Sequence, residues 1–164
     1  MKDSLTQRAQ IDEWARAGDP SAMLKLAELY LSEGKTDEAK NFLKQSAEKN
    51  FRPAVMTLAK LFDEEKNLPQ AVNFYKQAAE LKDVAAMERL VELCPSDEKI
   101  LNFVLEIIDK QYNEIYFMGN IIGQTMVFGS GRLSEYLPGQ AKAIERRRIK
   151  NKILKLKAAK EDLT

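Results

Sequence analysis

The sequence contains no histidine, and Cys94 is its only cysteine. Histidine is the commonest general base and metal ligand, so its absence removes the usual Ser-His or Cys-His catalytic pair. A single cysteine allows neither an internal disulfide bond nor a cysteine-rich zinc site. We therefore predict that the protein is not an enzyme and that it has no catalytic residues, no metal site and no cofactor.

Sequence motifs that bind nucleotides are also missing. The chain has neither a Walker-type Gly-x-x-x-x-Gly-Lys sequence nor a dinucleotide-binding Gly-x-Gly-x-x-Gly fingerprint. Gly129-Ser130-Gly131 is interpreted as a short flexible joint rather than a phosphate-binding loop.

Long apolar runs are scarce as well. Residues 1–8 carry charge where a secretory signal would have its apolar core. The apolar stretch 115–128 is too short to cross a membrane. We expect a cytoplasmic protein without a membrane span.

The charge is distributed unevenly along the chain. Apolar residues make up 45% and charged residues 31%, which is typical of an ordered globular chain. Residues 139–164 hold nine basic and three acidic residues, a net charge of +6, whereas the whole chain carries +1. Residues 1–138 therefore carry −5, and an acidic body is joined to a basic end. Either part could meet a charged partner.

An internal repeat with a period of 32 residues dominates the first part of the chain. Residues 22–30 recur without a gap at 54–62 and 86–94, and residues 39–48 recur at 71–80. The recurring positions are Ala22, Leu26, Ala27, Leu29 and Tyr30 in the first copy, Ala54, Leu58, Ala59, Leu61 and Phe62 in the second, and Ala86, Leu90, Val91, Leu93 and Cys94 in the third.

Each repeat is predicted to be a pair of helices. Met23, Leu26, Ala27 and Tyr30 have the i, i+3, i+4, i+7 spacing of one helical face. The segments 34–35 and 67–69 are interpreted as turns within repeats, with Pro69 in a first helical turn. Because one helical hairpin cannot bury both faces alone, stacked hairpins share a core.

The fold class that follows is all-α. We predict an α–α superhelix, a short solenoid of about three helix-turn-helix repeats with C-terminal capping helices and a basic amphipathic tail helix. The expected domains are a helical-repeat domain at 1–128 with a non-repeat capping helix from about 97, a flexible join at 129–139, and the basic helix at 140–164.

Residues 14–94 resemble the Sel-one-like repeats, which are relatives of the tetratricopeptide repeats. The resemblance rests on the Ala-x-x-x-Leu-Ala-x-x-Tyr pattern, on the Ala-Ala-Glu end of the second helix, and on residues 14–19, which look like half a repeat. It implies an interaction scaffold of the kind that serves secretion, signalling or complex assembly in bacteria.

The part of the chain after the repeats has a different pattern. Residues 95–98 are a plausible turn and N-cap, and a long helix is predicted from about 97 to 118. It is interpreted as a cap on the last repeat. The segment that follows either packs in the core or forms a surface for a partner or for self-association, and its apolar candidates are Met118, Ile121, Ile122, Met126 and Phe128.

The basic tail helix is the second candidate surface, with Arg146, Arg147, Arg148, Lys150 and Lys152 as its binding residues. It could be merely solvated, or it could contact nucleic-acid phosphates, an anionic membrane surface, or a groove on an acidic protein. The last alternative fits best, because no aromatic residue follows Tyr136 for stacking on bases or for insertion into a membrane.

The function that the sequence favours is a non-catalytic scaffold or adaptor whose partner is another protein. By analogy with tetratricopeptide helices, its concave face is formed by the first helices of the repeats. A nucleic-acid-associated protein that uses the basic helix is the alternative, and an inhibitor or immunity-type binding protein is a further one. The concave-face candidates are Leu24, Glu28, Leu31, Met56, Lys60, Asp63, Glu88 and Glu92.

Overall fold

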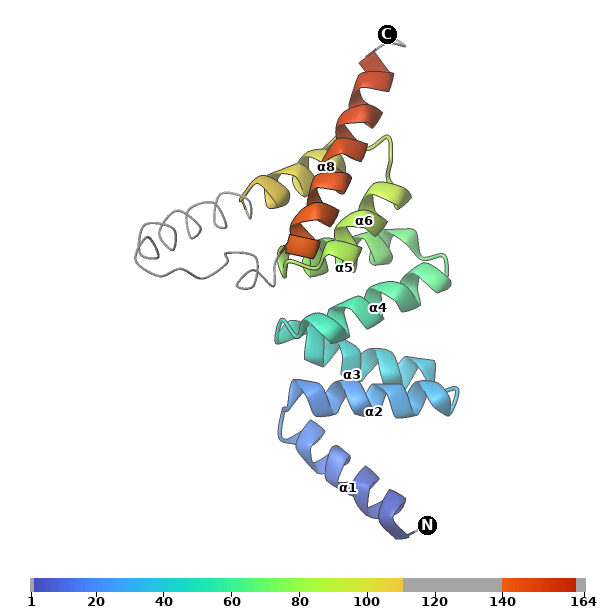
Figure 1. Ribbon diagram of the computed structural model, residues 1–164. Coiled ribbons are helices and arrows are strands. Elements are labelled where there is room, and N and C mark those ends of the chain that lie inside the picture. Colours follow the sequence, from blue (N-terminus) through green and yellow to red (C-terminus); the bar gives the residue numbers. More distant parts are fainter. Residues whose placement is uncertain (1, 111–139, 162–164) are drawn as a thin grey trace, which may run out of the picture. The chain divides into compact units, whose positions relative to one another are not determined.

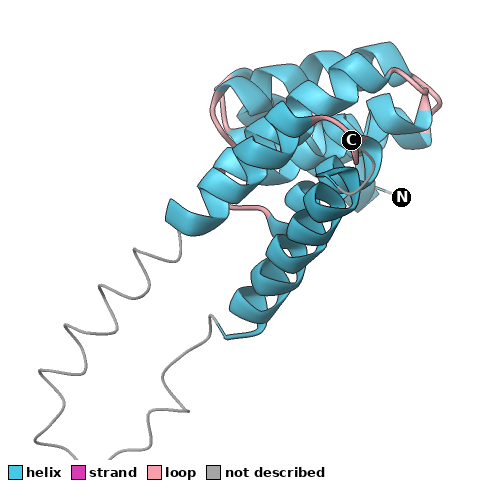
Figure 2. Ribbon diagram, turned by 90° about the horizontal axis from the view of Figure 1, so that it is seen from above, coloured by secondary structure: helices cyan, strands magenta, loops and turns pink. Residues whose placement is uncertain are grey.

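The computed structural model describes residues 2–110 and 140–161, and within these ranges all regular structure is helical (Figures 1 and 2). Successive helices pack against one another as in a helical-repeat solenoid, which confirms the predicted fold class. The chain divides into two compact units, Met1–Asp83 and Val84–Thr164, and each is described by itself. The predicted boundaries at 128 and 139, the join between them, and the candidates Met118, Ile121, Ile122, Met126 and Phe128 lie outside the described residues.

The first unit is a stack of antiparallel helical hairpins. α2 packs against α3 and α4 against α5, while α1 packs on α2 and α3 on α4 (Figure 1). The helices are α1 (Lys2–Arg16), α2 (Pro20–Ser32), α3 (Thr36–Glu48), α4 (Arg52–Glu64) and α5 (Leu68–Glu80). In repeat terms α2 and α4 are first helices, and α1, α3 and α5 are second helices.

Local sequence explains where two of these helices begin. The Asp19 carboxylate accepts a hydrogen bond from the Ala22 backbone N–H at 2.7 Å and so caps α2. Asn67 caps α5 in the same way through the N–H of Gln70. Pro69 lies in the first turn of α5, as predicted, where its missing N–H costs little.

In the turns between helices, residues with positive φ recur with the 32-residue period. Gly18, Asn50 and Lys82 follow successive second helices with φ of 91°, 56° and 65°. Gly34 and Lys66 follow successive first helices with φ of 77° and 61°. A residue in the left-handed region ends a helix and satisfies its last carbonyl groups, and glycine adopts this conformation most readily. The turn predicted at 34–35 is thereby confirmed. The second turn lies at 65–67, so of the predicted segment 67–69 only Asn67 is in it, and Leu68 and Pro69 already belong to α5.

Small side chains let the helices of the first unit approach closely. Ala27, Ala39, Ala54, Ala59 and Ala71 are completely buried. The aromatic residues of the repeat motif stack in register, Tyr30 on Phe42 with ring centroids 5.6 Å apart and Phe62 on Phe74 with centroids 5.5 Å apart. In both copies of the motif within this unit the positions of Ala22, Leu26 and Ala27 are buried in the core, as their spacing predicts, whereas the position of Leu29 is half-buried.

The second unit begins with the third first helix, α6 (Val84–Leu93), in which Ala86, Met87, Leu90 and Val91 are buried. A helix follows from residue 98 and is described as far as 110, and the Asp97 carboxylate accepts hydrogen bonds from the N–H groups of Lys99 and Ile100 at its start. This confirms the predicted turn and N-cap.

The basic tail helix α8 (Gln140–Glu161) packs within this second unit. Its Ile149 and Ile153 are buried, as are Leu101, Val104 and Ile108 of the helix 98–110. The polar contacts between the two helices run in opposite order along the chain, which makes the helices antiparallel. These contacts join Lys150 to Asp109, Lys157 to Asn102, and Lys160 to Glu98.

Candidate interaction surfaces

The predicted concave-face residues of the first unit lie on α2 and α4, which also touch each other directly. Leu24, Leu31 and Met56 are half-buried, whereas Glu28 and Lys60 are exposed. Asp63 is half-buried and accepts a hydrogen bond from the Tyr75 hydroxyl group at 3.3 Å. The face thus combines accessible apolar side chains with charges of both signs.

Glu88 and Glu92, the remaining candidates of this set, lie on α6 in the second unit. Glu88 is half-buried and Glu92 is exposed. The Glu92 carboxylate lies 3.1 Å from the Arg89 guanidinium and 3.8 Å from the Lys152 ammonium group. Part of its charge is therefore compensated within the unit.

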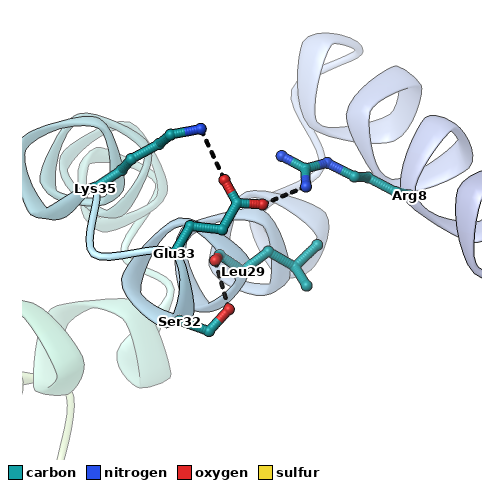
Figure 3. A network of polar contacts seen from close by, with 5 residues as sticks. All are labelled: Arg8, Leu29, Ser32, Glu33 and Lys35. Carbon is teal, nitrogen blue, oxygen red and sulfur yellow. Dashed lines mark hydrogen bonds and ion pairs between the residues drawn. The ribbon is translucent and has the colours of Figure 1, made fainter.

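A polar cluster joins α1 to the end of α2 (Figure 3). The Glu33 carboxylate forms ion pairs with Arg8 and with Lys35, the latter at 2.8 Å. Hydrogen bonds from Arg8 and then from Lys35 lower the pKa of Glu33 from 4.5 to about 2, and the same contacts raise the pKa of Arg8 and that of Lys35. The two cations also lie 5.9 and 5.7 Å from the centroid of the Tyr30 ring.

The same cluster recurs one repeat later. The Lys40 ammonium group lies 5.2 Å from the centroid of the Phe62 ring and forms an ion pair with Glu65. Lys40, Phe62 and Glu65 each stand 32 residues after Arg8, Tyr30 and Glu33. A cation on a second helix thus binds the aromatic ring and the carboxylate at the end of the next first helix. We call this arrangement the repeat clamp.

Two adjoining depressions follow the line between α1 and α2. One has a volume of about 650 Å³ and is lined by Trp14, by Ala17 and by the first turn of α2. The other has a volume of about 450 Å³ and lies between Gln7 and Ile11 of α1 and Glu28 of α2. Lys25 lines both of them, so they form one continuous surface.

Sequence reasoning missed most of this surface, since only Glu28 was among the candidates. The repeat period carried the missing signal. Trp14 stands 32 and 64 residues before Ser46 and Ala78, which are completely buried, yet Trp14 is 50% exposed. A large aromatic side chain that is exposed at a position buried in later repeats indicates that no described helix of this unit covers that face of α1.

The five candidate residues of the basic tail differ in their exposure and in their contacts. Arg146 is buried, and its Nε atom has no hydrogen-bond partner among the described residues. Lys150 and Lys152 contact Asp109 and Glu92. Arg147 and Arg148 are exposed, and with Ile144, Asn151 and Lys155 they line a depression of about 510 Å³. Only part of the tail charge therefore faces outward.

Within residues 2–110 and 140–161, no group of three or more acidic or cysteine side chains could hold a metal ion. No helix of the described chain is both long enough and apolar enough to cross a membrane.

Comparison with known families gives a match to one repeat of the chain. Residues 20–48 match the tetratricopeptide repeat family, and this range runs from the first residue of α2 to the last residue of α3. No curated protein and no solved structure matches the chain. The match supports the resemblance to tetratricopeptide-like helical repeats, which generally mediate contacts between proteins.

Proposed function

We propose that this protein is a non-catalytic scaffold that binds another protein through the first-helix face, defined as Leu24, Glu28, Leu31, Met56, Lys60 and Asp63. The observation that carries the proposal is the partial exposure of Leu24, Leu31 and Met56 on the adjacent helices α2 and α4, of which α2 lies in the matched tetratricopeptide repeat. Partly exposed apolar side chains with charged neighbours are typical of a protein-binding surface.

The chemistry of this face suits a polypeptide more than a nucleic acid. Glu28 and Asp63 are acidic and Lys60 is basic, so the face has no excess of positive charge to attract phosphates. A partner segment with an apolar stripe and charges of both signs would complement it. Glu88 and Glu92 on α6 are proposed separately as partner-binding residues of the second unit. The Sel-one-like subtype, a cytoplasmic location and a role in secretion, signalling or complex assembly belong to the same proposal.

Site-specific photo-crosslinking tests this proposal. A photoreactive amino acid replaces Lys60 on the first-helix face, and in a control it replaces Asn73, which is also exposed but lies on the second helix α5. We expect a defined protein adduct from position 60 in host extract, with much less from position 73. A second variant, Met56→Asp, should reduce the adduct. Equal adducts from both positions would contradict the proposed face.

A nucleic-acid role for α8 is the second candidate. Arg147, Arg148 and Lys155 are exposed and have no ion-pair partner in the described ranges. Backbone contacts to phosphates would make binding steeply dependent on salt concentration. Against this alternative, Lys150 and Lys152 already contact carboxylates of the same unit. The test is a titration of labelled DNA and RNA at several salt concentrations with the wild type and with an Arg147→Glu/Arg148→Glu variant. It decides between the protein-binding and the nucleic-acid-binding hypotheses.

A further inference from the structure

The face of α1 that carries Gln7, Ile11 and Trp14 is unlike the same face of later second helices. On α3 the equivalent residues Ala39, Leu43 and Ser46 are completely buried. On α5 the equivalents Ala71, Tyr75 and Ala78 are buried too. On α1, by contrast, Gln7 is exposed, Ile11 is half-buried and Trp14 is 50% exposed.

The first helix of each repeat is what covers this face elsewhere. The Ser46 hydroxyl group of α3 donates a hydrogen bond to the Pro20 carbonyl oxygen of α2 at 2.8 Å. On α5, Tyr75 reaches Asp63 of α4. Within the described part of the first unit, α1 packs extensively only against α2, which is the first helix of the next repeat. The two depressions beside Lys25 lie on this uncovered side.

We infer that the surface between α1 and α2 is a seat for one amphipathic helix contributed by a partner protein. The seat continues the interface that stacks the repeats: a helix placed there would pack on α1 as α2 packs on α3, and beside α2 as α2 lies beside α4. Its length would match the 13 residues of α2 and α4, or about 20 Å at 1.5 Å per residue.

The occupant requires the apolar stripe of a first helix, with small and large residues spaced i, i+3, i+4 and i+7. A second copy of the chain is a poor donor. Its own stripes on α2, α4 and α6 are buried, including Ala22 and Leu26 in α2 and Ala54 and Leu58 in α4. Donating one of them would require its own repeat to open. A helix from a different protein carries no such cost.

Trp14 makes the seat directly observable, because it is the only tryptophan in the chain. The probe is a capped synthetic peptide with the sequence of α2, Pro20–Ser32, which contains no tryptophan. Titrated into the full-length protein, it should shift the Trp14 emission to shorter wavelength and protect Trp14 from acrylamide quenching, and both effects should saturate. A peptide that carries Leu26→Asp should cause neither.

Two protein variants provide matched controls. Ala17→Arg places a large side chain in the larger depression from an exposed position and should weaken peptide binding at least tenfold, or about 1.4 kcal/mol. Ala9→Arg, at an exposed position on α1 that lines neither depression, should leave binding unchanged. Far-ultraviolet circular dichroism confirms that both variants are folded.

An emission spectrum that stays unchanged throughout the peptide titration would overturn the inference, as would equal binding of the Leu26→Asp peptide. A blue shift that grows with protein concentration alone would show that a second copy covers the seat, and would also overturn the choice of occupant. The inference rests on the proposed scaffold role, but the two tests fail separately. Crosslinking from position 60 concerns a residue that lines neither depression.

Discussion

The repeat clamp makes a quantitative prediction about stability, which the substitution Lys40→Gln tests. Lys40 has a side chain that is only 16% exposed, and its ammonium group lies over the Phe62 ring and beside the Glu65 carboxylate. Glutamine keeps most of the aliphatic stem and a polar end but removes the charge. The substitution therefore isolates the electrostatic part of the clamp from its packing.

The expected loss follows from two contributions. A partly exposed ion pair contributes about 0.5 kcal/mol, because solvent screens it. A cation over an aromatic ring contributes about 0.5–1 kcal/mol. We therefore expect Lys40→Gln to lower the free energy of unfolding by about 1–1.5 kcal/mol. For a unit of about 60–100 residues, each kcal/mol corresponds to a Tm change of about 4–8 °C, so the Tm of the first unit should fall by roughly 4–12 °C.

Urea and thermal unfolding of the full-length protein measure this loss. Lys44→Gln is the matched control, since Lys44 is exposed on the same helix and has no ion-pair partner in the described part of the chain. A double-mutant cycle with Glu65→Gln separates the ion pair from the contact with the ring. The reasoning would be refuted if Lys40→Gln and Lys44→Gln were equally destabilising, or if the cycle showed no coupling between Lys40 and Glu65.

Three further predictions concern the core, the turns and the pH dependence. Leu58→Ala removes a completely buried side chain and should lower the free energy of unfolding by about 2–5 kcal/mol, whereas Leu68→Ala, at a position 47% exposed, should cost far less in the same denaturation assay. Lys66→Gly should stabilise the protein, because Lys66 has φ of 61°, and Gly34→Ala should destabilise it by about 1 kcal/mol at the equivalent turn. The lowered pKa of Glu33 implies a stabilisation that is fully present above pH 4.5 and is lost as the pH falls towards 2. The difference in stability between the wild type and Glu33→Gln should therefore shrink over that window in acid titrations followed by circular dichroism.

Much of the fold could be predicted because helical spacing, turn positions and helix-start residues are all visible in the local sequence of the repeats. The pattern around Ala22, Leu26 and Tyr30 has a helical spacing, and its recurrence after 32 residues locates the turns. Asp97 and Pro69 identify the starts of two helices through their own chemistry, without help from distant residues. Local signals of this kind remain readable when the tertiary contacts are unknown.

The surfaces were harder to predict, because they depend on which helices lie together. Arg8 and Glu33 are 25 residues apart, and nothing in their local sequence indicates that they form an ion pair. Comparing equivalent positions would have revealed it, since a cation, an aromatic residue and a glutamate recur together at positions 40, 62 and 65. For the tail lysines, the sequence suggested a free surface where the structure shows contacts. Their number suggested a free basic surface, whereas Lys150 and Lys160 contact acidic side chains of the helix 98–110.

The left-handed turn residues have a consequence for how the chain tolerates insertions. One residue added inside a helix rotates every later side chain of that helix by about 100°, because a turn contains 3.6 residues. Such a rotation would move the apolar stripe away from its neighbour. At Gly18, Asn50 or Lys82 the backbone leaves the helix and a new helix begins. A residue added there lengthens a loop, and the next helix can keep its own phase. A change of length in one of these turns therefore need not disturb the packing of the other repeats.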